Sequence, residues 1–177
     1  MDTFFDLVAK RESCRNYADR PVEQEKLVAC IDAARLAPSA CNSQPWYFYV
    51  VNGPENSPKV AECAQHMGMN KFVAKCPAFC AVVEKNANFM EKLGSRITDQ
   101  KFAETDIGIA AAHYCLAATQ LGLSTCILGS FNEKKIKSFL DLSKASRVRL
   151  IIATGYAANA ELRKKTRKSM NEIAKFM

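Results

Sequence analysis

The feature that most restricts the fold of this chain is a long apolar segment past its middle. Residues 102–121 have a helical composition, are rich in alanine and would place apolar side chains on nearly every side of the helix. Such a helix belongs in a core or an interface, because a wet surface would leave its apolar side chains in water. Gly122 follows where a helix commonly ends. The rest of the fold must cover this helix, from the same chain or from a second subunit.

The other expected elements are short and alternate between helix and strand. Helices are predicted at residues 3–10, 21–38, 58–65, 132–140 and from about 168, and strands at 46–51, 78–83, 126–128 and 148–154. Phe4, Leu7 and Val8 are expected on the inner face of the first helix, and Pro21 is expected to open the second. Two helices precede the first strand, which does not fit a regular βαβ repeat. We therefore predict an α+β layered fold, in which helices flank one central mixed, mostly antiparallel sheet, with residues 1–177 as one domain.

Composition limits the class of protein. The chain has 177 residues, of which 49% are hydrophobic and 24% charged, which is typical of a globular protein with one core. Neither a secretory signal nor an apolar run of about 20 residues is visible, so a cytoplasmic location is expected, without a membrane span. The eight cysteines form no C-x-x-C pair and are expected to be small buried side chains rather than a metal site.

The net charge of +7 is concentrated near the end of the chain. The basic residues there are Arg163, Lys164, Lys165, Arg167 and Lys168. Such a cluster suits nucleic acid, an anionic cofactor or simple solubility. No aromatic residues are interleaved with it, as they are in many nucleic-acid-binding surfaces, so nucleic acid is not the expected partner.

Two motifs carry candidate chemistry. Arg11, Ser13 and Arg15 alternate after the first helix, so in an extended segment they point to one side and suit a phosphate; the alternative is that the arginines pair with surface carboxylates. The second motif is Ala-Pro-Ser-Ala-Cys-Asn-Ser-Gln-Pro-Trp at residues 37–46. Its amide side chains suit a planar ligand with hydrogen-bonding edges, although a loop stabilised by its own amides is equally compatible.

Together these motifs resemble the nitroreductase family of FMN enzymes. R-x-S-x-R is followed by A-P-S-x-x-N-x-Q-P-W, and further similarity lies at residues 106–111, 121–129, 153–156 and 165–168. The resemblance implies an intertwined homodimer with FMN at the subunit interface. It implies that Arg11, Ser13, Arg15, Lys165 and Arg167 hold the phosphate and ribityl chain.

The remaining site residues are also implied by the resemblance. The loop residues expected to reach the flavin, largely that of the opposite subunit, are Pro38, Ser39, Ala40, Asn42 and Gln44. Leu128 and Gly129 match the segment whose backbone N–H lies near flavin N5, and Asn70 matches an amide that touches the isoalloxazine edge.

Some features depart from the family pattern. Ala40 stands where the family often has serine, and Glu12 adds a negative charge beside the expected phosphate site, so Glu12 is expected to face outward. Family members often continue with an arm that wraps the partner, and this brace is expected to be missing in a chain that stops at Met177.

The implied activity is a ping-pong hydride transfer from NADH or NADPH, through flavin N5, to a nitroaromatic, quinone or similar electron-poor acceptor. No side chain is expected to act as acid, base or nucleophile, because the flavin supplies the chemistry. His113 is expected to be a satisfied core or interface residue, and residues 86–100 are expected to shape the acceptor pocket. The alternatives are a ferredoxin-linked enzyme, dehalogenation, flavin breakdown or redox sensing, and, more remotely, a basic nucleic-acid-binding module.

Overall fold

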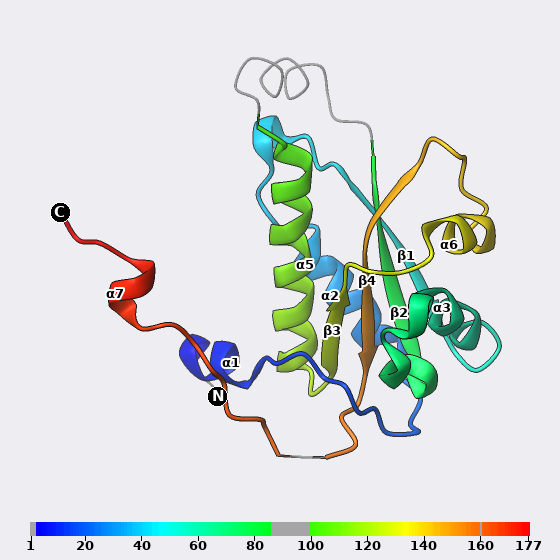
Figure 1. Cartoon of the computed structure of the whole chain (residues 1–177), viewed down its shortest axis with the longest axis horizontal. Coiled ribbons are helices and arrows are strands. Elements are labelled where there is room, and N and C mark those ends of the chain that lie inside the picture. Colours follow the sequence, from blue (N-terminus) through cyan, green and yellow to red (C-terminus); the bar gives the residue numbers. More distant parts are fainter. Residues whose placement is uncertain (1–2, 86–99, 160) are drawn as a thin grey trace.

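The computed structural model of the chain describes residues 3–85, 100–159 and 161–177, shown in Figure 1. The strands are β1 (Trp46–Asn52), β2 (Ala78–Glu84), β3 (Ser124–Leu128) and β4 (Arg147–Gly155). The α-helices are α1 (Phe4–Lys10), α2 (Gln24–Ala34), α3 (Ser57–Ala64), α5 (Phe102–Gln120), α6 (Glu133–Phe139) and α7 (Met170–Ile173). Short 3-10 helices occur at η1 (Ala40–Asn42), η2 (His66–Gly68) and η3 (Lys71–Lys75). Apart from Gln100, the expected acceptor loop at residues 86–100 lies outside the described residues.

The strands form one antiparallel sheet in the order β1-β2-β4-β3. A single parallel bridge, between Ser13 and Thr125, adds to its β3 edge. Helices α2 and α5 cover one face, and α3 and α6 the other, as Figure 1 shows. The predicted α+β layered fold is confirmed, and the mixed character of the sheet is limited to that bridge.

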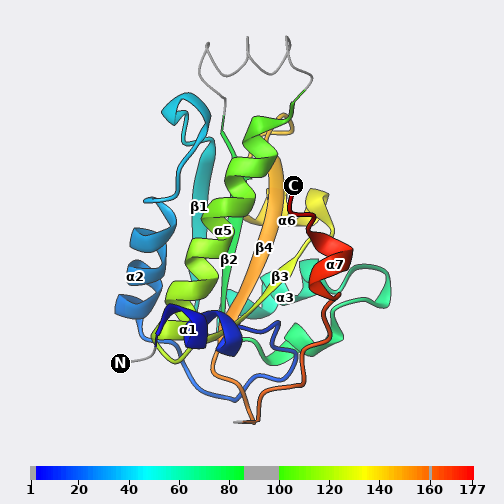
Figure 2. The same cartoon turned by 90° about the vertical axis from the view of Figure 1, so that its left-hand side faces the viewer.

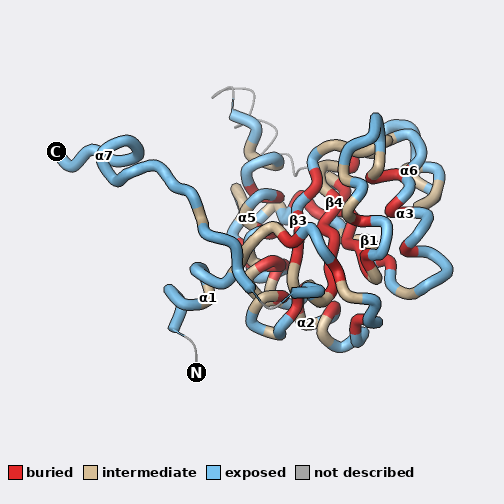
Figure 3. The backbone as a smooth tube through the Cα atoms, turned by 60° about the horizontal axis from the view of Figure 1, so that its bottom comes forward, coloured by how far each residue is buried: buried red, intermediate tan, exposed pale blue. Residues whose placement is uncertain are grey.

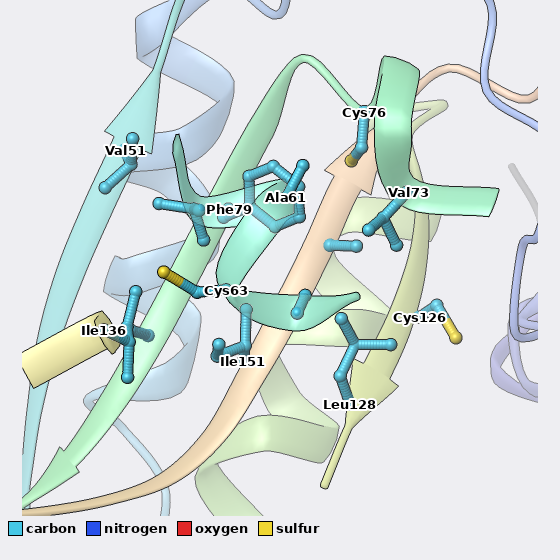
Figure 4. Packing of buried hydrophobic residues seen from close by; sticks show 14 of the residues in the cluster. Val51, Ala61, Cys63, Val73, Cys76, Phe79, Cys126, Leu128, Ile136 and Ile151 are labelled. Atoms are coloured by element: carbon cyan, nitrogen blue, oxygen red, sulfur yellow. The ribbon is translucent and has the colours of Figure 1, made fainter. Parts of the chain in front are cut away.

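The central strand β2 is buried on both faces of the sheet. Ala78, Cys80 and Val82 pack with α2 and α5, while the alternate residues Phe79, Ala81 and Val83 pack beneath α3 and α6. Figure 4 shows the second cluster, in which Phe79 and Ile151 meet side chains of the overlying helices. Hydrophobic residues at every position from 78 to 83 are therefore explained by two cores on opposite faces.

Helix α5 buries one side and leaves the other uncovered within the chain. The buried side faces α2 and the sheet and comprises Asp106, Ile107, Ala110, Ala111, Tyr114, Cys115 and Ala118. On the opposite side Gly108 and Ala112 are exposed, and a Cβ atom added at Gly108 would meet nothing within 4 Å. The prediction of a core or interface helix is confirmed for the buried side. The exposed side retains the small and apolar character of an interface.

Helix α1 does not pack as the sequence predicts. Thr3 caps it through a hydrogen bond from the Asp6 N–H to its hydroxyl, at 3.2 Å. None of the residues Phe4–Lys10 is buried, and Phe4 and Val8 are 64% and 42% exposed. The expected inner face is thus wrong for the single chain. Sequence periodicity identified the apolar face, but it did not identify what covers it.

The second helix starts later than predicted. It begins at Gln24 with Glu23 as the N-cap residue, so Pro21 precedes the helix instead of opening it. The Glu23 carboxylate accepts hydrogen bonds from the Tyr156 hydroxyl, at 2.5 Å, and from Arg20, at 3.2 Å. These contacts tie the approach to α2 to the end of β4, which explains why residues 20–23 stay out of the helix.

Residues 161–177 leave the body of the molecule as a projecting arm. Figures 1 and 3 show this segment passing α1 and extending beyond it, with α7 near its end. Leu162, Met170, Ile173 and Phe176 are between 54% and 85% exposed. The expected absence of a brace around the partner stays a prediction, because it concerns a second subunit. This arm adds to the apolar surface that the single chain leaves in water.

Candidate functional site

The R-x-S-x-R motif and the basic end of the chain come together at one pocket. Its volume is about 280 Å³, and its lining residues are Arg11, Glu12, Ser13, Arg15, Arg163, Lys164, Lys165, Thr166 and Arg167. All five residues predicted for the phosphate site, from segments about 150 positions apart in the sequence, therefore meet in space. We call these lining residues the cationic pocket.

The backbone of residues 11–15 is held against the start of β3. The Cys14 N–H donates to the Thr125 carbonyl at 2.8 Å, beside the bridge between Ser13 and Thr125. Cys14 is buried, so alternation along the extended segment leaves Ser13 and Arg15 on the side that faces the pocket. The Arg15 guanidinium also lies 5.9 Å from the centre of the Phe72 ring. The first motif is thus held against the sheet edge, and within the described part of the chain neither Arg11 nor Arg15 forms the ion pair with a carboxylate that the alternative required.

The basic segment closes the pocket through contacts to residues 9–13. The Arg163 backbone N–H and its Nε both donate to the Glu12 carboxylate at 3.3 Å. Arg163 also donates to the Ser13 carbonyl, and the Lys165 ammonium donates to the Ala9 carbonyl. The expectation that Glu12 faces outward is therefore wrong. Arg163, Lys164 and Thr166 also line the pocket. The sequence alone identified Arg163 and Lys164 only as part of a basic cluster, and it indicated no role for Thr166.

The charge of the cationic pocket defines its chemistry. Six cationic side chains and one carboxylate line it, and Ser13 and Thr166 add hydroxyl groups. Arginine forks and ammonium groups converging in this way suit a phosphate monoester, which carries nearly two negative charges at neutral pH and accepts several charge-assisted hydrogen bonds. Nucleic acid would instead require a basic surface that extends along its backbone, whereas these cations gather around one open pocket.

The loop after α2 has a strained backbone. Cys41, Asn42 and Gln44 adopt positive φ angles of 50°, 49° and 48°, which L-residues rarely adopt. The Gln44 N–H donates to the Ser39 hydroxyl at 3.0 Å, and its side-chain amide donates to the Asn42 side-chain oxygen at 3.2 Å. Pro38, Asn42 and Gln44 are exposed, and Ala40 and Ser39 are half-buried. Backbone strain of this kind is concentrated at functional sites in proteins, although the internal amide contacts stabilise the loop as well.

The buried carboxylate of Asp106, on α5, holds the backbone of this loop through a hydrogen bond. The Asp106 Oδ2 atom accepts a hydrogen bond from the Ala40 N–H at 3.0 Å, and Asp106 is only 5% exposed. Sequence reasoning missed this role. The available signal was an acidic residue in the first turns of an otherwise apolar helix, where an unpaired charge would be costly.

The end of β3 brings a third group of predicted residues together. Leu128 is buried, while Gly129, the next residue, is exposed, with open space where a Cβ atom would be. The Asn70 side-chain amide donates to the Ser130 and Ala64 carbonyls at 2.9 and 3.1 Å. Asn70 therefore lies beside the Leu128–Gly129 turn, where its amide nitrogen anchors the residue that follows the turn.

The cationic pocket and the loop lie at opposite ends of α5 (Figure 2). Asp106, which holds the loop, is in the first turns of the helix, whereas Thr125, which pairs with the pocket segment, follows its last turn. The helix has 19 residues and so spans about 28 Å. By contrast, Gly129 is four residues from Thr125 along β3, about 13 Å. Within one chain, a ligand in the cationic pocket can reach the end of β3 but not the loop.

Most of the other reactive side chains are buried cysteines. Of the eight cysteines, Cys41 is exposed and the other seven are buried. Burial raises the pKa of the Cys76 thiol to about 12, which suppresses the thiolate. His113 lies on α5 with its Nδ1 atom 2.9 Å from the Ile109 carbonyl. Among the residues that the structure describes, no group of three His, Cys, Asp or Glu side chains is placed to hold a metal ion.

A helix that crosses a bilayer must be both long and apolar. In the described part of the chain, no helix has both the length and the apolarity that a membrane-spanning segment needs.

A family model, relatives from several organisms and solved structures match this chain and identify the same family. The chain matches the nitroreductase family over residues 8–156. The oxygen-insensitive NADPH nitroreductase of Helicobacter pylori is 27% identical over 92% of this chain and 91% of its own length. The FMN reductase [NAD(P)H] of Bacillus subtilis is 28% identical over 81% of this chain and 61% of its own length. The solved FMN-dependent nitroreductase of Clostridium difficile R20291 has a TM-score of 0.75 and 26% identity, with 98% of both chains covered.

Proposed function

The chain belongs to the nitroreductase family, and on that premise we propose that it is an FMN-dependent oxidoreductase that uses NAD(P)H. The observation that carries this proposal is the cationic pocket, in which two segments far apart in the sequence converge. Its charge and hydroxyl groups fit the phosphate of FMN, and relatives whose names include FMN and NAD(P)H support the cofactor and the donor.

The fit extends from the phosphate to the ring. Arg11, Ser13, Arg15, Lys165 and Arg167 would hold the phosphate and the first atoms of the ribityl chain. Thr125 and Gly129 lie about 13 Å apart along β3, so a ligand that extends along this strand from the cationic pocket would approach the Leu128–Gly129 turn. The exposed backbone at Gly129 would then lie at the ring, because no side chain intervenes there.

When bound, FMN supplies two-electron chemistry, accepting hydride from the nicotinamide at N5 and passing it to an electron-poor acceptor. The side chains described here bind and orient. The cations hold the phosphate, the backbone of Leu128–Gly129 presents an N–H to the ring, and Asn70 fixes that turn through the Ser130 carbonyl. A nitroaromatic or a quinone is the acceptor class we propose, because a flat apolar ring can stack on the flavin.

A second copy of the chain would complete the site. The loop at residues 38–44 is strained, exposed and too far from the cationic pocket of its own chain. The outer side of α5, the apolar face of α1 and the arm are all uncovered. We propose a homodimer in which these surfaces are buried and the loop of each copy contacts the ring bound by the other, with residues 1–177 acting as one domain.

The test compares FMN with riboflavin, which lacks the phosphate. Purified protein should be yellow, should bind FMN more tightly than riboflavin, and should oxidise NADH or NADPH with a nitroaromatic or a quinone. Arg15→Ala should weaken FMN binding about tenfold or more and riboflavin binding little, since a charge-assisted hydrogen bond contributes roughly 1.5–3 kcal/mol. Arg35→Ala, which removes a surface arginine that pairs with Asp32, is the matched control and should change neither affinity. Equal loss of both ligands in Arg15→Ala would refute the phosphate role.

Measurements of turnover and of flavin content distinguish the proposed function from the alternative functions. Yellow protein that oxidises neither nicotinamide with any acceptor would instead favour a ferredoxin-linked or redox-sensing flavoprotein. Colourless protein that takes up no FMN and binds DNA with steep salt dependence would refute the flavin proposal.

A further inference from the structure

Glu12 is an acidic residue inside a pocket that otherwise gathers cations. It lies between Arg11 and Ser13, and its side chain is only 17% exposed. Its Oε2 atom accepts from both the backbone N–H and the Nε of Arg163, at 3.3 Å each. The same arginine donates to the Ser13 carbonyl. One carboxylate thus fastens the guanidinium and the backbone of Arg163 to the first phosphate motif.

In the part of the segment that the structure describes, backbone carbonyls of the N-terminal residues accept hydrogen bonds on either side of this contact. Before it, the Ala158 N–H donates to the Asn16 carbonyl at 2.9 Å. After it, the Lys165 ammonium donates to the Ala9 carbonyl. Residues 161–164 and 166–177 are exposed. The Glu12–Arg163 pair is therefore the ionic contact that holds the base of the arm, with Lys165 and Arg167 just beyond it, against residues 11–15.

We propose that Glu12 is a positioning residue for the phosphate site. By holding Arg163, it keeps residues 163–167 folded over residues 11–15, so that the pocket closes on a phosphate from two sides. Glu12 does not itself contact the phosphate; it acts through Arg163. This inference rests on the proposed function, because it assumes that the phosphate of FMN is the ligand of the cationic pocket.

Removing the charge of Glu12 distinguishes positioning from direct repulsion of the phosphate, because the two predict opposite changes in FMN affinity. A carboxylate beside a phosphate repels it, so through-space electrostatics predicts that removing the charge tightens FMN binding. Positioning predicts the opposite, because the arm cations lose their anchor. The pair is partly exposed, at 55% for Arg163 and 17% for Glu12, so the expected weakening is modest, about fivefold.

The experiment measures the dissociation constants of FMN and riboflavin for Glu12→Gln, which keeps the shape and removes the charge. We expect FMN binding to weaken about fivefold and riboflavin binding to stay unchanged. Glu161→Gln is the matched control, because it removes the same charge near the same segment without altering the Glu12–Arg163 contact. It should leave FMN binding unchanged or slightly tighter.

Two further variants separate positioning from a general loss of stability. Exchanging the pair, as Glu12→Arg with Arg163→Glu, preserves the net charge of the pocket and should recover most of the FMN affinity that either single substitution loses. Trypsin should also cut at Lys164 and Lys165 faster in flavin-free Glu12→Gln than in the unmodified protein, because the arm is less firmly held. Tighter FMN binding by Glu12→Gln, or an unchanged cutting rate, would overturn the inference.

The proposed function and the positioning role of Glu12 are refuted by different results. If the unmodified protein prefers FMN to riboflavin and Glu12→Gln does not weaken FMN, only the positioning role is refuted. If the unmodified protein binds FMN no better than riboflavin, the proposed function is refuted and this inference is refuted with it.

Discussion

Removal of the Asp106 carboxylate tests how the strained loop is maintained. Three left-handed residues, Cys41, Asn42 and Gln44, cost together roughly 3 kcal/mol. The two hydrogen bonds made by Gln44 within the loop return about 1 kcal/mol each, and the bond from the Ala40 N–H to the buried Asp106 carboxylate returns about 2 kcal/mol. The loop conformation is therefore favoured by only about 1 kcal/mol, and Asp106 decides the balance.

Asp106→Ala should reverse that balance and leave the loop in its present conformation for only a minority of the time. Because the apparent affinity falls with the competent fraction, flavin binding should weaken about fivefold. FMN and riboflavin should be affected equally, since the loop is proposed to contact the ring and not the phosphate. Asp106→Asn, which retains an acceptor oxygen, should lose only about half of this free energy.

The assay is flavin titration followed by fluorescence, together with thermal unfolding. Glu104→Ala is the control, because Glu104 lies on the same turn of α5 and pairs with the partly exposed Arg149 at 3.2 Å. Mixing Asp106→Ala protein with Arg15→Ala protein adds a second readout, since a mixed dimer would contain one intact site. Unchanged affinity for both flavins in a folded Asp106→Ala protein would refute the reasoning, as would preferential loss of FMN.

The remaining predictions concern the phosphate clamp, the dimer and acid stability. Arg167→Ala should resemble Arg15→Ala, weakening FMN far more than riboflavin in the same titration. Dilution to monomer should release flavin, which analytical ultracentrifugation with detection at the flavin absorbance would measure. Ala112→Glu should release flavin at any protein concentration and leave the far-ultraviolet circular dichroism unchanged. Flavin retained by a demonstrated monomer would contradict the shared site. The hydrogen bond from the Tyr156 hydroxyl lowers the pKa of Glu23 from 4.5 to about 2. A depressed carboxylate pKa adds stability that is complete above the ordinary pKa and is lost as the pH falls toward the folded value, so Glu23→Gln should lower the melting temperature near pH 6 and have little effect near pH 2.

The sequence was sufficient to predict elements whose boundaries are set by local chemistry. Asn132 caps α6 through a hydrogen bond from the Lys135 N–H at 3.0 Å, as expected, and Trp46 is buried at the start of β1. Periodicity and capping determine such features within a few residues. The start of α2 was missed, because Glu23 and Tyr156, which hold residues 20–23, lie 133 positions apart in the sequence.

Features that depend on contacts between distant segments could not be predicted in the same way. The resemblance to the family assigned Arg15 and Arg167 to one site, and in the structure both side chains line the cationic pocket. The orientation of Glu12 was predicted wrongly, because its partner Arg163 becomes a neighbour only when the basic segment folds over the first motif. Burial of α1 was also predicted wrongly, since amphipathic spacing reports that a face is apolar and not which chain covers it.

The separation along α5 gives the uncovered surfaces a common explanation. The loop contacts α5 at Asp106, about 21 Å along the axis from the last residue of the helix, Gln120, beyond which the cationic pocket lies. The exposed small residues Gly108 and Ala112 lie on the helix between these two points. In the proposed symmetric pair, a two-fold axis perpendicular to α5 and beside its middle would set the two copies of the helix antiparallel. The loop of one copy would then approach the pocket side of the other. Exposed small residues near that axis would let the two helices approach closely. The same arrangement would bring the second copy against α1 and the arm, and would cover the apolar side chains that the single chain leaves exposed.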